Sequence, residues 1–172
     1  MRRDGAKAGD EIWVSGQPGR AALGLAHLQR RIALVETQLG DCLAALHRPL
    51  PRVGLGLALR GLATAAIDVS DGLLADLGHI LEQSSLAARL QIPGLPAAGP
   101  QRDCLLAGGD DYELVFTVPA ARHAEVTALT ARLELALTCI GKVETGTAGR
   151  IDLHDDDGRP LAIGRRGYDH FA

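Results

Sequence analysis

The residues of this chain best suited to chemistry form a short acidic motif, I-D-V-S-D-G, at positions 67–72. Two carboxylates, Asp68 and Asp71, flank the hydroxyl group of Ser70. Converging carboxylates repel one another unless a cation lies between them. Mg²⁺ suits such a site because it binds one or two carboxylates and completes its shell with water and substrate phosphate. The alternative is structural: Ser70 or Asp71 caps a helix and Asp68 ends a strand in solvent. On the local pattern alone, we favour this alternative.

A second acidic motif, G-G-D-D-Y-E-L, occupies positions 108–114. Its paired glycines permit close approach of the backbone to a ligand. Three acids follow within four positions, namely Asp110, Asp111 and Glu113. The alternation that begins at Tyr112 predicts that Asp111 and Glu113 share a face. The alternative interpretation is a β-turn with solvated acids, which the local pattern alone favours.

Three further segments are less suited to chemistry. The glycine-rich segment at 16–24 enters a predicted helix, but it lacks the G-K-[S/T] of a phosphate loop and the acid of a dinucleotide-binding fold. The H-D-D-D-G segment at 154–158 predicts a hairpin turn, since a calcium loop needs a longer run that ends in Glu. His79 follows the first motif on a predicted helix, where we expect a surface residue rather than a metal ligand.

Hydrophobic periodicity predicts the elements that must position these motifs. Strands are expected at 11–16, 65–69, 87–92, 112–118 and 138–144, helices at 17–36, 40–47, 71–83 and 120–136, a weakly helical segment at 53–65, a loop at 93–103 and a hairpin at 150–163. The first acidic motif therefore lies at a strand-to-helix junction, where free backbone N–H groups can hold an anion. Interleaved strands and helices predict a layered α/β or α+β domain.

Composition narrows the class of protein. The 172 residues are 47% hydrophobic and 23% charged with a net charge of −3, which is typical of a globular domain. No stripe of Lys and Arg is present and aromatic residues make up 3%, so we expect no nucleic-acid partner. The polar N-terminus and the absence of a long apolar run predict neither a secretory signal nor a membrane span. Isolated cysteines at positions 42, 104 and 139 favour reduced thiols in a cytoplasmic protein.

Taken in order, several segments resemble the C-terminal half of the thiamine-monophosphate kinase family. They are I-D-V-S-D-G-L-L-A-D-L-G-H-I at 67–80, A-G-G-D-D-Y-E-L-V-F-T-V-P at 107–119, T-C-I-G-K-V-E-T-G at 138–146 and G-Y-D-H-F at 167–171. Segments 5–28 and 48–53 resemble the part that joins the two halves of the family and begins its second domain. The resemblance covers almost the whole chain, and its relatives include aminoimidazole ribonucleotide synthetase, selenophosphate synthetase and a hydrogenase-maturation protein.

The resemblance implies a fold, an activity and a set of site residues. The fold is an α+β, layered α/β/α domain with a mixed sheet. The activity is transfer of the γ-phosphoryl group of ATP to thiamine monophosphate, which gives thiamine diphosphate and uses several Mg²⁺ ions. Asp68 and Asp71 match magnesium ligands, and Ser70 matches a residue that contacts ATP. Asp110 matches a substrate-contacting acid that is often Glu in the family. Tyr168 matches an aromatic position near the thiamine, where cation–π attraction has a physical basis.

The same resemblance predicts how the chain is organised. Residues 1–15 correspond to the inter-domain segment and first strand and residues 16–172 to the C-terminal domain, whereas the family's N-terminal nucleotide-binding domain is absent. The family homodimer forms mainly through that domain. We therefore expect a chain that is incomplete as a kinase, with an apolar face left exposed near 21–28 and 54–65. The alternative is a non-catalytic ligand-binding or interaction domain that retains the kinase fold.

Overall fold

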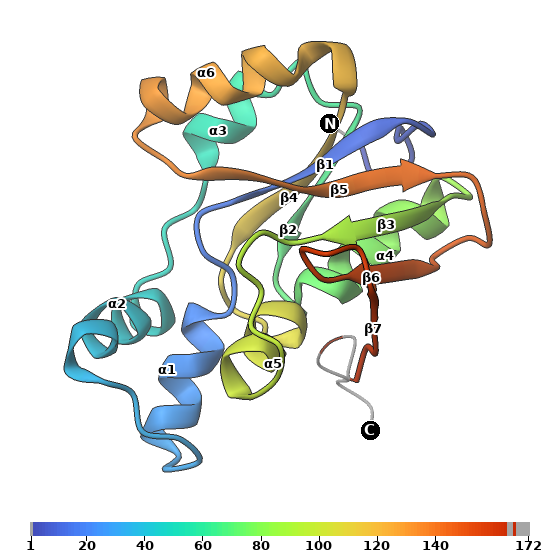
Figure 1. Ribbon diagram of the computed structural model, residues 1–172. Helices are drawn as coiled ribbons and strands as arrows, with labels where there is room; N and C mark the ends of the chain where they lie inside the picture. The colour runs from blue at the N-terminus through green and yellow to red at the C-terminus, as the bar shows by residue number, and fades with distance from the viewer. Residues whose placement is uncertain (1, 165–166, 168–172) are drawn as a thin grey trace.

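The computed structural model describes residues 2–164 and residue 167, and a seven-stranded sheet runs through this part of the chain in the order β2-β4-β1-β5-β3-β6-β7 (Figure 1). The strands are β1 (Asp10–Ser15), β2 (Ala65–Val69), β3 (Ala87–Gln91), β4 (Glu113–Pro119), β5 (Leu137–Glu144), β6 (Ile151–His154) and β7 (Pro160–Leu161). Neighbouring strands pair antiparallel except β3 and β6, which pair parallel. The sheet is therefore mixed.

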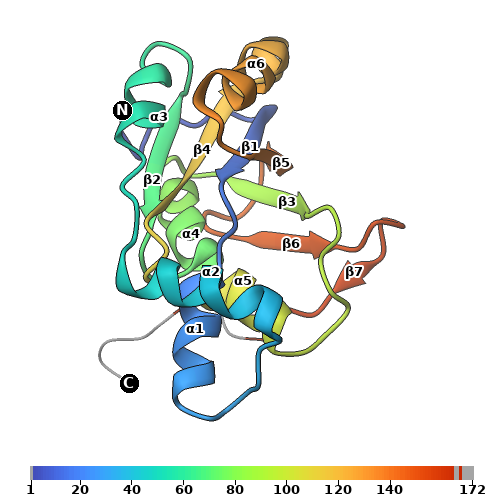
Figure 2. The same ribbon diagram turned by 90° about the vertical axis from the view of Figure 1, so that its left-hand side faces the viewer.

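Helices cover both faces of the sheet and one end of it. They are α1 (Arg20–Leu28), α2 (Glu36–His47), α3 (Val53–Ala58), α4 (Leu73–Gln83), α5 (Pro100–Ala107) and α6 (His123–Leu133), and a short 3₁₀ turn, η1 (Ala120–Arg122), precedes α6. α4 packs on one face, and α3 and α6 pack on the other. α1, α2 and α5 lie together beyond the ends of the strands (Figure 2). The layered α+β architecture is thus confirmed.

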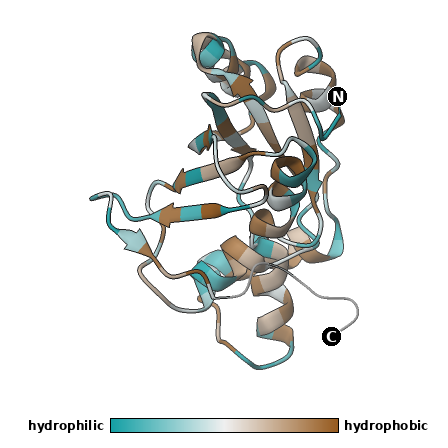
Figure 3. Ribbon diagram, turned by 90° about the vertical axis from the view of Figure 1, so that its right-hand side faces the viewer, coloured by the Kyte–Doolittle hydropathy of each residue, from teal (hydrophilic) through white to brown (hydrophobic). Residues whose placement is uncertain are grey.

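Alternation along the central strands divides the apolar side chains between two cores. In β1, Ile12 and Val14 enter the core beneath α4, whereas Trp13 enters the core beneath α3 and α6. Hydrophobic and hydrophilic residues likewise alternate along the strands at the left of Figure 3. The predicted periodicity of α4 is also confirmed, because its five apolar residues at helical spacing are each at most 1% exposed. These are Leu73, Leu74, Leu77, Ile80 and Leu81.

Several predicted elements have other bounds in the structure: α2 begins at Glu36 rather than at position 40, and the weakly helical segment expected at 53–65 is helical only to Ala58. The helix expected at 17–36 ends at Leu28, because Arg30 adopts a φ of 59° and the Arg31 N–H donates to the carbonyl oxygen of Ala26. This closure is a Schellman-type end, which glycine usually signals and which arginine supplies here. The loop expected at 93–103 contains the start of α5, whose first residue is Pro100. Proline fits that position because its missing N–H would have no partner within the helix.

Candidate functional site

The first acidic motif connects β2 to α4, as the sequence predicted. The N-cap of α4 is Gly72, which has no side chain of its own, so the expectation that Ser70 or Asp71 is the cap is wrong. Instead, Oδ2 of Asp76 accepts the N–H groups of Ser70 (2.9 Å), Asp71 (3.0 Å) and Gly72 (3.1 Å). Burial raises the pKa of Asp76, and the three N–H donors oppose this shift. The N–H groups expected to hold an external anion are therefore bound to the chain's own carboxylate.

The second acidic motif lies directly against the first. The N–H of Asp110 donates to the carbonyl oxygen of Ser70 and that of Tyr112 to the carbonyl oxygen of Val69, both at 3.0 Å. Gly109 has no room for a side chain, because a Cβ there would overlap the Ser70 carbonyl oxygen. The exposed Asp110 and Tyr112 adopt positive φ angles of 67° and 53°, which are uncommon for residues other than glycine. Two motifs about 40 positions apart in the sequence thus form one surface.

Gly167, the first residue of the G-Y-D-H-F segment, also reaches this surface. A Cβ on Gly167 would lie 2.5 Å from the Cβ of Ala75 and 2.9 Å from the carbonyl oxygen of Asp71, so this glycine packs directly on the junction of β2 and α4. Tyr168, the predicted contact for the thiamine moiety, lies outside the described residues. The structure therefore brings together the two acidic motifs and the first residue of G-Y-D-H-F, which belong to three of the four segments quoted for the resemblance.

Asp111 and its neighbour Asp110 lie in different surroundings. It is 7% exposed, and its carboxylate accepts the N–H groups of Gly19 (2.5 Å) and Ala21 (3.0 Å) at the start of α1. This arrangement satisfies two N–H groups that the helix itself cannot pair. Burial raises the pKa of Asp111 to about 6, against the opposing effect of its two N–H donors. Asp111 thus ties the second acidic motif to α1.

This pKa shift predicts a pH-dependent contribution to stability. The pKa of Asp111 in the folded chain, about 6, lies above its ordinary value of 3.8, so the folded state binds the proton more tightly. The resulting stabilisation is fully present below about pH 4 and is lost as the pH rises through about 6. We expect the free energy of unfolding, relative to that of Asp111→Asn, to fall by about 2 kcal/mol between about pH 4.5 and 7. Urea denaturation of the unmodified chain and of Asp111→Asn at both pH values measures this difference. A difference that does not change with pH would contradict the raised pKa of Asp111.

Glu113 forms the second buried link of this motif. Its carboxylate accepts hydrogen bonds from Oγ of Ser15 (2.5 Å) and from Nε (2.6 Å) and Nη2 (2.5 Å) of Arg52. Ser15 Oγ in turn accepts the N–H of Leu114 at 2.9 Å. Asp111 and Glu113 both contact the segment from Ser15 to Ala21, which agrees with the predicted shared face. Both are buried, so the alternative of a turn with solvated acids is wrong for these two residues. Glu113 therefore fixes the second acidic motif to Ser15 and Arg52. Its carboxylate also pairs with the positive charge of the Arg52 guanidinium group.

The two predicted magnesium ligands have different surroundings. Asp68 is half-buried in β2 and lines a cavity of about 520 Å³ together with Arg52 and Tyr112. Asp71 offers a ligand atom within 4.8 Å of ligand atoms of Asp76 and His79, a grouping of oxygen and nitrogen donors that could hold a metal ion. The convergence of Asp68 and Asp71 on one cation stays a prediction.

The sequence interpretation missed the part that Asp76 and His79 play in this grouping. His79 is exposed on α4, as expected of a surface residue, yet its ring lies near Asp71. The available signal was the spacing of Asp76 and His79, because residues three apart share a helix face. That face is directed to the loop before the helix, which periodicity alone does not reveal.

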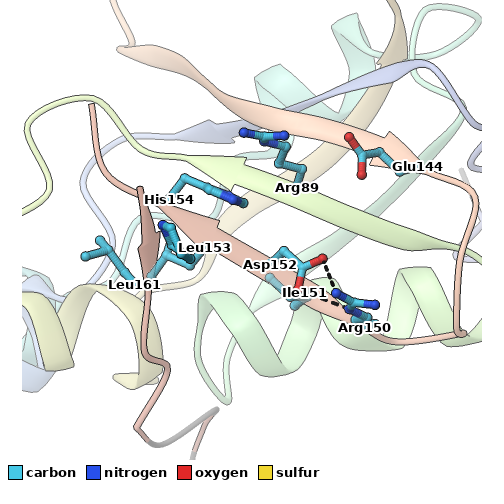
Figure 4. A pocket seen from close by; sticks show the side chains of 9 residues that line it. Arg89, Glu144, Arg150, Ile151, Asp152, Leu153, His154 and Leu161 are labelled. Carbon is cyan, nitrogen blue, oxygen red and sulfur yellow. Dashed lines mark hydrogen bonds and ion pairs between the residues drawn. The ribbon is translucent and has the colours of Figure 1, made fainter. Parts of the chain in front are cut away.

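A second cavity, of about 310 Å³, lies at the other end of the sheet on the face formed by β3 and β6 (Figure 4). Arg89, Glu144 and His154 line it together with an ion pair between Arg150 and Asp152. None of the predicted site residues that the structure describes lines this cavity. The predicted site residues that the structure describes therefore lie nearer the other end of the sheet, which carries β2.

Large apolar side chains are exposed near the segments where a docking face was expected. Leu25 and Leu28 of α1 are 36% and 50% exposed, and Val53 and Leu57 of α3 are 65% and 59% exposed. Single exposed apolar residues are common, but these four belong to the two predicted segments or adjoin them. Among the described residues, no helix combines the length and the apolar character needed to cross a membrane.

Known proteins match this chain in both sequence and fold. The family model described as "AIR synthase related protein, C-terminal domain" matches residues 7–154. The thiamine-monophosphate kinase of Escherichia coli (strain K12) is 41% identical over 182 aligned positions, which cover 100% of this chain and 55% of that protein. That of Haemophilus influenzae is 37% identical and is likewise covered to 55%.

Solved structures agree with these matches. The crystal structure of thiamine-monophosphate kinase from Stenotrophomonas maltophilia K279a aligns with a TM-score of 0.79 and 42% identity over 92% of this chain and 53% of that one. A structure described as AaThiL complexed with AMPPCP and TMP aligns with a TM-score of 0.76 and 29% identity over 98% of this chain and 53% of that one. The chain thus spans about half the length of the kinases that it matches. It belongs to the family of AIR synthase related proteins and corresponds to their C-terminal domain.

Proposed function

We propose that this chain is the C-terminal part of a kinase that transfers the γ-phosphoryl group of ATP to thiamine monophosphate. The observation that carries the proposal is the contact of the two acidic motifs with each other and with Gly167: the N–H of Asp110 donates to the carbonyl oxygen of Ser70, and Gly167 packs on Asp71. The likeness to thiamine-monophosphate kinases over the whole chain, one of them complexed with AMPPCP and TMP, supports these substrates.

In this proposal, Asp68 and Asp71 hold Mg²⁺, Ser70 contacts ATP, and Asp110 and Tyr168 contact thiamine monophosphate. The carboxylates supply the oxygen ligands that Mg²⁺ prefers, and the grouping of donors around Asp71 fits a bound cation. When bound, Mg²⁺ neutralises negative charge on the phosphates that react.

The protein's own residues have positioning roles in this chemistry. No nucleophile on the protein is required, because a phosphate oxygen of thiamine monophosphate attacks the γ-phosphorus and ADP leaves. The loop that holds Ser70 and Asp71 is fixed by Asp76, and the turn that holds Asp110 is fixed to it by backbone hydrogen bonds. Arg52 is engaged by Glu113, and the carboxylates of Asp68, Asp71 and Asp110 would repel nucleotide without a cation.

The wider organisation follows the same proposal. Residues 1–15 lead from an N-terminal nucleotide-binding domain into the domain formed by residues 16–172, and the exposed apolar side chains of α1 and α3 lie where that domain docks. The complete kinase is a cytoplasmic homodimer that assembles mainly through the N-terminal domain.

Joining the chain to the missing half tests the proposal. We expect the 172-residue chain alone to form no measurable thiamine diphosphate from ATP and thiamine monophosphate with Mg²⁺. The same chain joined behind the N-terminal half of the Escherichia coli kinase is expected to turn over at about 1–100 s⁻¹. Chromatography of the product measures both rates. A joined chain that folds and binds ATP without turnover would instead favour the non-catalytic ligand-binding domain, and rapid turnover by the chain alone would contradict the incomplete site.

A further inference from the structure

We propose that Asp76 is a positioning residue that fixes the backbone of residues 70–72 and thereby sets the carboxylate of Asp71 for a divalent cation. The proposal rests on the cation-binding role given to Asp71 above. Asp76 is assigned no contact with the nucleotide or with thiamine monophosphate, and it acts through the loop that it holds.

The geometry around one oxygen atom carries this inference. Oδ2 of Asp76 accepts N–H groups from three consecutive residues, Ser70, Asp71 and Gly72, at 2.9, 3.0 and 3.1 Å. Consecutive N–H groups at a helix start form a concave site that ordinarily holds an external anion. Asp76 is 2% exposed, so its carboxylate fills this site from within the protein.

Occupation of this site has a chemical consequence for any phosphate bound at the surface. The N–H groups of residues 70–72 are engaged by Asp76 and are not available to phosphate oxygens. Phosphate binding at this loop must then use other groups, of which a cation held by Asp71 is the one that fits its acidic surroundings. Asp76 thus directs the loop towards metal-mediated binding rather than direct binding by N–H groups.

The ligand atoms grouped around Asp71 supply a second observation. Ligand atoms of Asp71, Asp76 and His79 all lie within 4.8 Å of one another. The charge of Asp76 therefore adds to the field that a cation at Asp71 experiences, besides fixing the loop. Residues that orient a metal ligand in this way typically change metal affinity about 10–100-fold when they are replaced.

Binding of Mn²⁺ to the 172-residue chain tests the inference, with Mn²⁺ as the probe and electron paramagnetic resonance as the measure of free ion. Asp76→Asn, which retains the shape and removes the charge, is expected to raise the Kd for Mn²⁺ by at least about tenfold. Asp71→Asn is expected to abolish binding at the same site. Hydrogen exchange of the amides of residues 70–72 is expected to accelerate at least about tenfold in Asp76→Asn.

Asp10→Asn provides the matched control. Asp10 is also buried, at 4% exposed, and it also accepts a backbone N–H, that of Lys7 at 2.9 Å, together with the hydroxyl group of Thr64 at 2.6 Å. Its replacement removes a similar buried carboxylate without touching residues 70–72. We expect Asp10→Asn to leave both the Kd for Mn²⁺ and the exchange of these three amides within twofold of the unmodified chain.

Each outcome decides the inference. An unchanged Kd or unchanged exchange in Asp76→Asn overturns it, as does an equal change in Asp10→Asn. If Asp76→Asn does not fold, Asp76→Ser must show the same weakened binding. Absence of Mn²⁺ binding to the unmodified chain also overturns the inference, whereas the proposed function fails on a different result, the absence of turnover by the joined kinase.

Discussion

Replacement of Arg52 by methionine is expected to lower the free energy of unfolding by about 3–5 kcal/mol. The guanidinium group of Arg52 bonds to both carboxylate oxygens of Glu113, and the two side chains are only 24% and 8% exposed. Methionine retains most of the length of the arginine stem but leaves the buried Glu113 carboxylate with the Ser15 hydroxyl group as its remaining described side-chain partner. An unpaired buried charge is the costly product of this substitution.

Urea denaturation measures this change through its midpoint, with the slope unchanged if both states keep their compactness. Arg159→Met is the matched control, because Arg159 pairs with Asp157 at 3.1 Å in an exposed position and its loss should cost less than about 1 kcal/mol. Adding Glu113→Gln to Arg52→Met should recover a large part of the loss, since the two residues are directly coupled. A loss of less than 1 kcal/mol in Arg52→Met would show that Glu113 is not held by charge pairing.

The second large effect concerns activity. In the chain joined behind the N-terminal half of the Escherichia coli kinase, Asp71→Asn is expected to lower kcat by about 100-fold, which corresponds to about 3 kcal/mol, and to raise the Mg²⁺ concentration for half-maximal rate. An amide carries no charge and is a poorer ligand for Mg²⁺ than a carboxylate. Initial rates measured across a range of Mg²⁺ concentrations separate the two effects.

Asp152→Asn is the control for that experiment. Asp152 is also a partly exposed acid, but it pairs with Arg150 beside the second cavity. Its replacement should leave both kcat and the Mg²⁺ requirement unchanged. If the Mg²⁺ requirement of Asp71→Asn equalled that of the unmodified enzyme, the assignment of Asp71 as a ligand would be withdrawn.

The sequence was sufficient to locate the acidic motifs on the fold. Helical spacing after position 72 and a short apolar run before position 68 predicted the junction of β2 and α4, and the structure confirms it. Alternation predicted that Asp111 shares a face with Glu113, but it could not predict which groups Asp110 and Asp111 contact. What distinguishes them is the start of α1, which receives Asp111 and lies about 90 positions earlier in the chain.

The contacts of individual side chains could not be predicted for the same reason. The anchoring of Glu113 by Arg52 and the position of His79 beside Asp71 depend on how distant segments pack. The end of α1 depended on Arg30, a residue that rarely adopts a positive φ. Periodic patterns predict which face of a helix or strand is buried, whereas these features depend on which residues of other segments pack against that face.

The position of β1 between β4 and β5 in the sheet has a consequence for the synthesis of the protein. β1 is synthesised before the other six described strands, and its partner strands β4 and β5 follow much later, since the bonded residues Ser15 and Glu113 are 98 positions apart. At about 5–20 residues per second, roughly 5–20 s pass before that partner exists. During this interval Ile12, Trp13 and Val14 have no strand to pair with, so the nascent chain carries an apolar segment that chaperones can bind. Long-range pairing of this kind also predicts slow refolding.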